Sequence, residues 1–121
     1  MTLKKINDTY GHPIGDIALQ GVTASITEAI REYDYAFRMG GDEFLIFLPD
    51  TKKTEAYSFA ERIRASIGNI KLKSHGDNIT ITCSFGISQC TSKDVNIEVV
   101  VGQADEALYA VKKSGKNRVK I

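Results

Sequence analysis

Residues 35–48 read YAFRMGGDEFLIFL, and this stretch decides how the rest of the chain is interpreted. Two short runs rich in aromatic and branched apolar residues, 35–39 and 44–48, flank Gly40-Gly41-Asp42-Glu43. Runs of this kind favour extended strands, and paired glycines permit the unusual backbone dihedrals of a tight turn. We therefore expect an antiparallel β-hairpin that carries two acidic side chains at its tip.

Helical and extended patterns lie on both sides of this hairpin. Apolar residues recur at steps of three and four in a helix that opens at Gly15, and again across 56–67 and 96–113. Residues 79–87 alternate apolar and polar side chains, which predicts a strand, and 118–121 predict a short closing strand. Together these elements predict an α+β fold, with one mixed, mainly antiparallel sheet flanked by helices.

Length and composition limit the classes of protein to consider. The 121 residues suit one domain over 1–121, and 42% hydrophobic with 26% charged residues is typical of a globular protein. A net charge of +1 gives no general case for binding nucleic acid, and no apolar run could span a bilayer. The two cysteines predict reduced thiols and a cytoplasmic location, with Cys83 on the apolar face of its strand.

The hairpin tip carries the strongest chemical signal. Glycines such as Gly40 and Gly41 let a large ligand approach the main chain, and the adjacent carboxylates of Asp42 and Glu43 suit magnesium. The alternative is a solvated turn, since glycine and aspartate are common in turns for conformational reasons alone.

Three segments together resemble the GGDEF-domain diguanylate cyclases. They are RMGGDEF at 38–44, KKINDTYGHPIGD at 4–16 and ADEALYAVKKSGKNR at 104–118. The resemblance implies a nucleotidyl cyclase fold with a ferredoxin-like palm. It also implies an enzyme that condenses two GTP molecules into cyclic di-GMP and releases two pyrophosphates. Two copies would face each other as a homodimer, each holding one GTP, downstream of a sensory or regulatory domain in a longer protein.

The resemblance also implies roles for individual residues. The expected catalytic residues are Asp42 and Glu43, with Asp42 as the ligand of Mg²⁺ or Mn²⁺. Contacts to GTP are expected from Lys4, Asn7, His12, Asp16, Gly40, Gly41, Lys112 and Lys116. Within this set, Asn7 and Asp16 would bind the guanine edge, and the lysines would meet the phosphates. Lys116 stands where the family usually has arginine, so the charge is kept but the bidentate fork is lost.

Each of these residues has a structural alternative. Asn7 and Asp8 could form a turn, and His12 before Pro13 could be an ordinary loop residue. Lysines near the end of a helix are favourable there without any ligand.

A second constellation, Arg31-Glu32-Tyr33-Asp34, resembles the family's RxxD site, where the product binds and slows the enzyme. Arg62 stands where the family often places a further arginine of that site. Arginine suits the role because it can fork onto phosphate and stack on a guanine face. An RxxD pattern is also common at helix ends, which is the alternative.

The chain begins after the Asp-x-Asp segment that precedes these motifs in the family. The resemblance therefore implies a missing strand, open sheet edges and a missing magnesium ligand, so that this chain alone is expected to have weak activity or none. The simpler explanation of this start is that the natural protein is longer and this chain is a fragment of it. Two other functions stay open: a module that binds GTP or cyclic di-GMP without catalysis, and an interaction domain.

Overall fold

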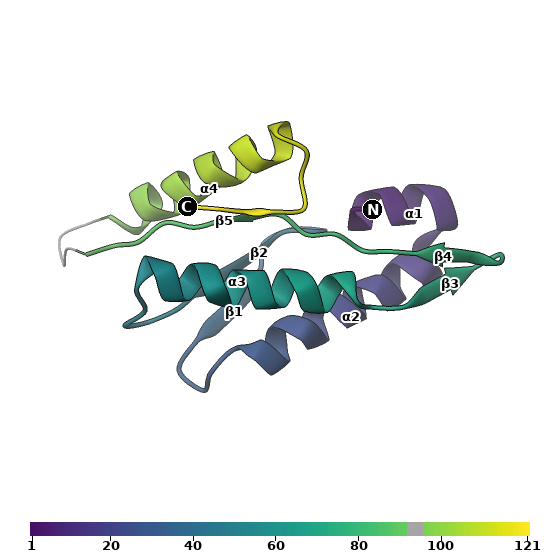
Figure 1. Ribbon diagram of the computed structural model, residues 1–121, viewed down its shortest axis with the longest axis horizontal. Helices are drawn as coiled ribbons and strands as arrows, with labels where there is room; N and C mark the ends of the chain where they lie inside the picture. Colours follow the sequence, from purple (N-terminus) through teal and green to yellow (C-terminus); the bar gives the residue numbers. More distant parts are fainter. Residues whose placement is uncertain (92–95) are drawn as a thin grey trace. The chain divides into compact units, whose positions relative to one another are not determined.

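The computed structural model describes residues 1–91 and 96–121 (Figure 1). Its helices are α1 (Leu3–Tyr10), α2 (His12–Ala29), α3 (Lys53–Gly68) and α4 (Ile97–Lys113). Its strands are β1 (Tyr35–Arg38), β2 (Phe44–Phe47), β3 (Leu72–Ser74), β4 (Asp77–Ile79), β5 (Phe85–Gly86) and β6 (Val119–Lys120). The residues group into two compact units, Met1–Pro49 with Ala65–Thr82, and Asp50–Arg64 with Cys83–Ile121.

The first unit begins with two consecutive helices. The Thr2 hydroxyl accepts a hydrogen bond from the Lys5 amide at 3.3 Å and caps α1. Gly11, with φ of 90°, separates α1 from α2. The sequence predicted a helix from Gly15, but α2 starts three residues earlier, at His12. Pro13 does not prevent this, because amides in the first turn of a helix have no helical partner to lose.

Apolar side chains of this unit are buried where the periodicity predicted. Val22 and Ile26 on α2 are buried, although Leu19 and Ile30 of the same stripe are only half-buried. The remaining buried apolar residues of the unit are Leu3, Ile6, Ala18, Ile67, Leu72, Ile79 and Ile81.

The predicted hairpin is confirmed. Strands β1 and β2 pair antiparallel from Tyr35 opposite Phe47 to Arg38 opposite Phe44. The Phe37 and Phe47 rings meet edge to face with centroids 6.1 Å apart, a favourable aromatic arrangement. Residues 39–43 are therefore left as the exposed tip of the hairpin.

The strand predicted over 79–87 forms only in part. Strand β4 ends at Ile79 after pairing antiparallel with β3, and β5 covers only Phe85 and Gly86. Between them, the backbone hydrogen bonds among the described residues run to Met1: the chain's amino group donates to the Thr80 carbonyl at 2.6 Å, and the Thr82 amide donates to the Met1 carbonyl at 2.9 Å. A strand needs a continuous ladder, and one partner residue is too few to make one.

In the second unit, α4 lies against the parallel pair of β5 and β6. The Asn96 side chain accepts a hydrogen bond from the Glu98 amide at 2.8 Å, so the predicted start of this helix is confirmed, as is its end before Gly115. Gly86 has no room for a side chain, because a Cβ there would meet the Ala104 carbonyl and the Leu108 amide of α4. The stripe predicted for α3 is buried at Phe59, Ala60, Ile63 and Ile67.

The α+β class and the mainly antiparallel pairing are therefore confirmed. A single mixed sheet was predicted, whereas the strands of the described residues pair in three two-stranded sheets. Each strand is only two to four residues long and bonds to one neighbour. Within the same residues, no helix is long and apolar enough to cross a membrane.

Candidate functional site

The hairpin tip is an exposed loop with a fixed backbone. The Met39 amide donates to the Glu43 carbonyl at 2.8 Å, which closes the loop at its base. The Arg38 guanidinium donates from Nε to the Gly40 carbonyl at 3.0 Å and from Nη2 to the Gly41 carbonyl at 2.8 Å. One side chain therefore holds two consecutive carbonyl groups of the loop. The sequence placed Arg38 inside the motif but gave it no role, and an arginine two positions before the glycine pair was the available signal.

The loop presents the predicted catalytic residues to solvent. Asp42 and Glu43 are exposed, and side chains added at Gly40 or Gly41 would meet no atom within 4 Å. Oxygen donors on an open loop fit the chemistry of Mg²⁺, which prefers one or two carboxylates together with phosphate oxygens. Across residues 1–91 and 96–121, no group of three or more His, Cys, Asp or Glu side chains forms a candidate metal site.

The junction of α1 and α2 brings together the residues predicted to bind guanine. Asn7 lies in α1, so the alternative that it belongs to a turn is wrong. Its carboxamide packs on Gly15, and Asp16 follows as the next, exposed residue of α2. His12 is the exposed first residue of α2 rather than a loop residue, and Lys4 is exposed on α1.

Two of the lysines predicted to bind phosphate lie at the end of α4. Lys112 lies in the last turn of the helix and Lys116 in the loop that follows, both exposed. Lys116 and Asn117 have positive φ values of 63° and 49°. The loop is nevertheless fixed, because the Asn117 amide donates to the Ser84 hydroxyl at 3.0 Å and Arg64 donates to the Asn117 side chain at 3.3 Å. Favourable charge at a helix C-terminus explains the lysines of the last turn equally well.

Arg31 and Asp34 form a tight local pair. The Asp34 carboxylate is buried and accepts three hydrogen bonds from Arg31, from its amide at 2.7 Å, its Nε at 3.1 Å and its Nη2 at 3.2 Å. Burial alone would raise the pKa of Asp34, but the hydrogen bonds and the charge of Arg31 outweigh it and lower the pKa. The Arg31 guanidinium also lies 4.6 Å from the centre of the Tyr33 ring.

The remaining arginine of the predicted inhibitory site lies on α3. Arg62 is exposed, and its guanidinium carbon is 5.9 Å from the centre of the Phe59 ring. Arg62, Lys112 and Lys116 belong to the second compact unit, and the other predicted site residues belong to the first.

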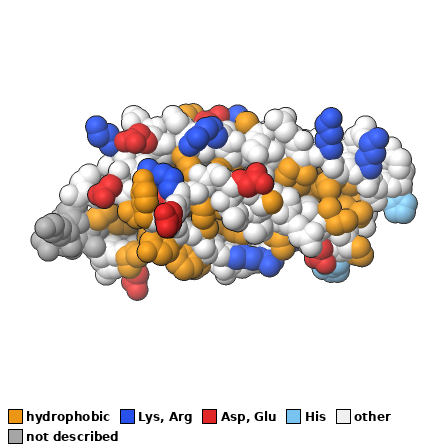
Figure 2. Space-filling model, turned by 90° about the horizontal axis from the view of Figure 1, so that it is seen from below, with side chains coloured by type: hydrophobic (Ala, Val, Ile, Leu, Met, Phe, Trp, Pro, Cys, Tyr) orange, Lys and Arg blue, Asp and Glu red, His pale blue; other side chains and the backbone are white. Residues whose placement is uncertain are grey.

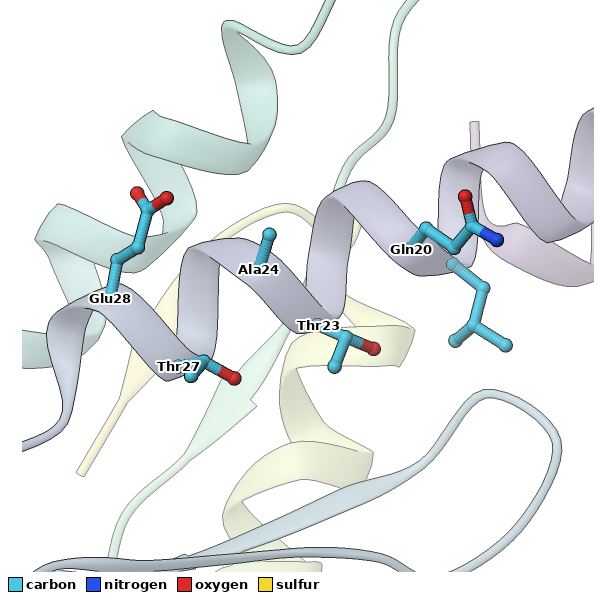
Figure 3. A pocket seen from close by; sticks show the side chains of 6 residues that line it. Gln20, Thr23, Ala24, Thr27 and Glu28 are labelled. Atoms are coloured by element: carbon cyan, nitrogen blue, oxygen red, sulfur yellow. The ribbon is translucent and has the colours of Figure 1, made fainter.

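A shallow hollow of about 480 Å³ lies along α2. Figure 3 shows that its lining side chains all come from that one helix, among them Gln20, Thr23, Thr27 and Glu28. It contains none of the predicted nucleotide-binding residues. A groove without converging charged groups is not suited to hold a triphosphate, so we base the site on the hairpin tip and the helix junction.

Figure 2 shows basic and acidic side chains interspersed on the face that it presents. This agrees with the net charge of +1, so any anion site is a local arrangement of cations.

The motif residues and their placement match a known family. Residues 1–118 match the family described as diguanylate cyclase, GGDEF domain. The chain belongs to the GGDEF family. Diguanylate cyclase A from Treponema denticola is 41% identical over 116 residues, covering 96% of this chain and 31% of that protein. Diguanylate cyclase DosC from Escherichia coli K12 is 40% identical over 119 residues, covering 98% of this chain and 26% of that protein.

Solved GGDEF structures share the fold. The GGDEF domain of DgcB from Caulobacter crescentus, in complex with c-di-GMP, has a TM-score of 0.85 at 29% identity and covers 98% of this chain and 70% of that one. Diguanylate cyclase SiaD from Pseudomonas aeruginosa, in complex with its activator SiaC, has a TM-score of 0.87 at 32% identity and covers 97% of this chain and 45% of that one. This GGDEF chain thus spans about a quarter to a third of the two curated relatives.

Proposed function

We propose that residues 1–121 form one catalytic domain, which supplies one GTP-binding half of a homodimeric diguanylate cyclase. The hairpin tip supports this most directly, because Arg38 fixes the backbone of Gly40 and Gly41 while Asp42 and Glu43 stay exposed. A loop that is already ordered loses little further conformational entropy of its own when it binds a metal–triphosphate complex.

Asp42 would hold Mg²⁺ or Mn²⁺ together with phosphate oxygens of GTP, with Glu43 beside it. Bound there, the cation would neutralise charge that develops on the triphosphate. Asp42 would also lie near the 3′-hydroxyl of the nucleotide. That hydroxyl would lose its proton, to water or to a neighbouring carboxylate, as its oxygen forms a bond to the α-phosphorus of the GTP on the partner domain and the bond to pyrophosphate breaks. The same exchange in the other direction would close the ring.

The other predicted residues would bind and orient GTP. Asn7 and Asp16 offer an amide and a carboxylate to the guanine edge, with His12 at the start of the same helix. Lys4, Lys112 and Lys116 would meet the phosphates, and the main chain at Gly40 and Gly41 leaves room for the nucleotide. Positioning and charge are the main contributions that a protein makes to phosphoryl transfer.

The first experiment compares the chain with its Asp42→Asn variant, using chromatography to detect cyclic di-GMP after incubation with GTP and Mg²⁺. Asp50→Asn is the matched control, because Asp50 is an exposed turn residue with φ of 49°, a conformation that asparagine tolerates. We expect weak activity at most from this chain alone. Asp42→Asn should lower whatever rate it shows at least about 100-fold, more than the loss of a group that only supports a metal ligand, and Asp50→Asn should leave that rate unchanged.

GTP and cyclic di-GMP binding are measured on the same samples by calorimetry, so that slow turnover by this chain does not hide the site. GTP binding without product would support the nucleotide-binding half of the proposal and reject catalysis by this chain. A chain that binds neither nucleotide would overturn the proposal and favour an interaction domain.

Product inhibition is a second part of the proposal, through Arg31, Asp34 and Arg62. The pairing with Asp34 holds the Arg31 guanidinium in one orientation, while its side chain stays 43% exposed for a phosphate or a guanine face. Asp34→Asn should weaken cyclic di-GMP binding, whereas Glu32→Gln, which removes an exposed charge two residues away, should not. Cyclic di-GMP binding without GTP binding would instead support a sensor module.

A sensory or regulatory domain in a longer parent protein and a cytoplasmic location complete the proposal. The relatives named above are three to four times the length that this chain covers, which leaves room for such a domain in them.

A further inference from the structure

Gly15 is buried at the point where α1 meets α2, and the side chain of Asn7 fills the space that a side chain at Gly15 would take. A Cβ at Gly15 would have Asn7 Oδ1, Cγ and Nδ2 as its three nearest atoms, the last two at 2.6 and 3.4 Å. Real Cβ atoms essentially never approach another heavy atom within 3.0 Å. The Asn7 carboxamide therefore occupies the space that any other residue at 15 would fill.

The orientation of this carboxamide is informative. Asn7 Oδ1 faces Gly15 and is buried, and it finds no hydrogen-bond partner in the part of the chain that the structure describes. Buried acceptors are almost always satisfied, so an exception calls for an explanation, such as strain, a functional role or an ordered water. With Oδ1 turned against α2, the Nδ2 amino group lies on the side away from Gly15.

From this contact we infer that Gly15 is a positioning residue, which sets the place of the Asn7 amide and through it the selectivity for guanine over adenine. The inference rests on the proposed function. Guanine carries acceptors at O6 and N7, whereas adenine carries an amino group in place of O6. An amide that presents its amino group outward can pair with the guanine acceptor and meets a second donor in adenine, while the Asp16 carboxylate accepts from the guanine amino group.

Gly15→Ala tests the contact, and Gly102→Ala is its matched control. Both glycines lie inside helices, but a Cβ at Gly102 would meet nothing within 4 Å. Because alanine is the better helix former, Gly102→Ala should leave the thermal midpoint unchanged or higher. Gly15→Ala should lower it by at least about 4 °C, the shift that corresponds to a modest steric clash in a domain of this size.

A double-variant cycle shows whether the clash is with Asn7. In an Asn7→Ala background the obstructing carboxamide is gone, so Gly15→Ala should no longer lower the midpoint. The double variant also remains available for study if Gly15→Ala alone fails to fold. An equal loss in both backgrounds would overturn the proposed contact.

Selectivity is measured as the ratio of the ATP and GTP dissociation constants. We expect Gly15→Ala to reduce this ratio at least about fivefold, the low end of what one base-edge contact provides, and Gly102→Ala to leave it unchanged. General loosening of the fold would weaken the binding of ATP and of GTP alike, since both carry the same triphosphate. The ratio of their dissociation constants would then stay the same. If the wild-type chain binds GTP and Gly15→Ala leaves the ratio unchanged, this inference is overturned while the proposed function stands. A wild-type chain that binds neither nucleotide would overturn the proposed function and this inference with it.

Discussion

The pairing of Asp34 with Arg31 gives a prediction about stability that does not depend on any ligand. In Asp34→Asn, the side-chain oxygen can still accept a hydrogen bond from the Arg31 amide. The carboxylate that accepts two hydrogen bonds from the Arg31 guanidinium is lost, and its negative charge is lost with it. Hydrogen bonds to charged groups contribute about 1.5–3 kcal/mol each when buried. Because the Arg31 side chain is 43% exposed and recovers water, we expect a smaller total loss, about 1–2 kcal/mol.

The loss should also depend on pH. The pKa of Asp34 is lowered in the folded protein, so its carboxylate stabilises the fold fully above the unfolded value of about 3.9. That stabilisation disappears as the pH falls through the lower, folded pKa. The difference between wild type and Asp34→Asn should therefore be constant from pH 7 to pH 5 and shrink below about pH 4.

Urea denaturation followed by circular dichroism across this pH range measures the difference directly. Glu32→Gln is the control, since it removes an exposed charge in the same turn and should change the free energy of unfolding by no more than about 0.5 kcal/mol. The reasoning fails if Asp34→Asn is as stable as wild type at pH 7. It also fails if the difference persists unchanged at pH 3, because the charge would then not be its source.

Three further predictions concern residues outside that turn. Arg38→Ala should speed hydrogen exchange of the hairpin-tip amides about fivefold, equivalent to about 1 kcal/mol of lost hydrogen bonding. Arg38→Lys should not restore the slow exchange, because lysine lacks the guanidinium fork. Unchanged exchange in Arg38→Ala would show that the arginine does not hold the loop. Gly86→Ala should destabilise the protein by about 2–3 kcal/mol in denaturation, because a rigid backbone surrounds the added methyl, whereas Gly68→Ala has open space and should not. Burial raises the pKa of Cys83 to about 11, so in a Cys90→Ser variant its thiol should react with a maleimide at pH 7.5 about 100-fold more slowly than a free cysteine. A rate equal to that of the free thiol would contradict this one.

The sequence predicted elements whose signals are local and missed those that depend on a distant partner. The hairpin at 35–48 and the helix over 96–113 follow from β-rich runs, an N-cap and apolar periodicity, and both are confirmed. The glycines of the hairpin tip are not there for their dihedrals, because neither Gly40 nor Gly41 adopts a positive φ. The strand over 79–87 had the clearest alternation in the chain. Alternation describes only the side chains, however, whereas a strand is defined by backbone bonds to a partner strand. Among the described residues, Thr80 and Thr82 bond to Met1, and pairing with a strand stops at Ile79 and resumes at Phe85.

The same division applies to the site. Motif letters point to residues that could face a ligand, such as Asn7, Asp42 and Arg31, but not to the contacts that hold them. The structure supplies those contacts. Gly15 leaves the space that the Asn7 carboxamide fills. Arg38 bonds to the carbonyls of Gly40 and Gly41, and Asp34 bonds to the Arg31 guanidinium. Gly15, Arg38 and Asp34 need not contact GTP to affect binding or catalysis. Their loss would displace the residue that faces the ligand, and a displaced residue is misaligned even when its own chemistry is intact. Substitutions at these three positions should therefore separate the proposed activities. Base selectivity should respond to Gly15, order of the hairpin tip to Arg38, and the proposed binding of cyclic di-GMP to Asp34.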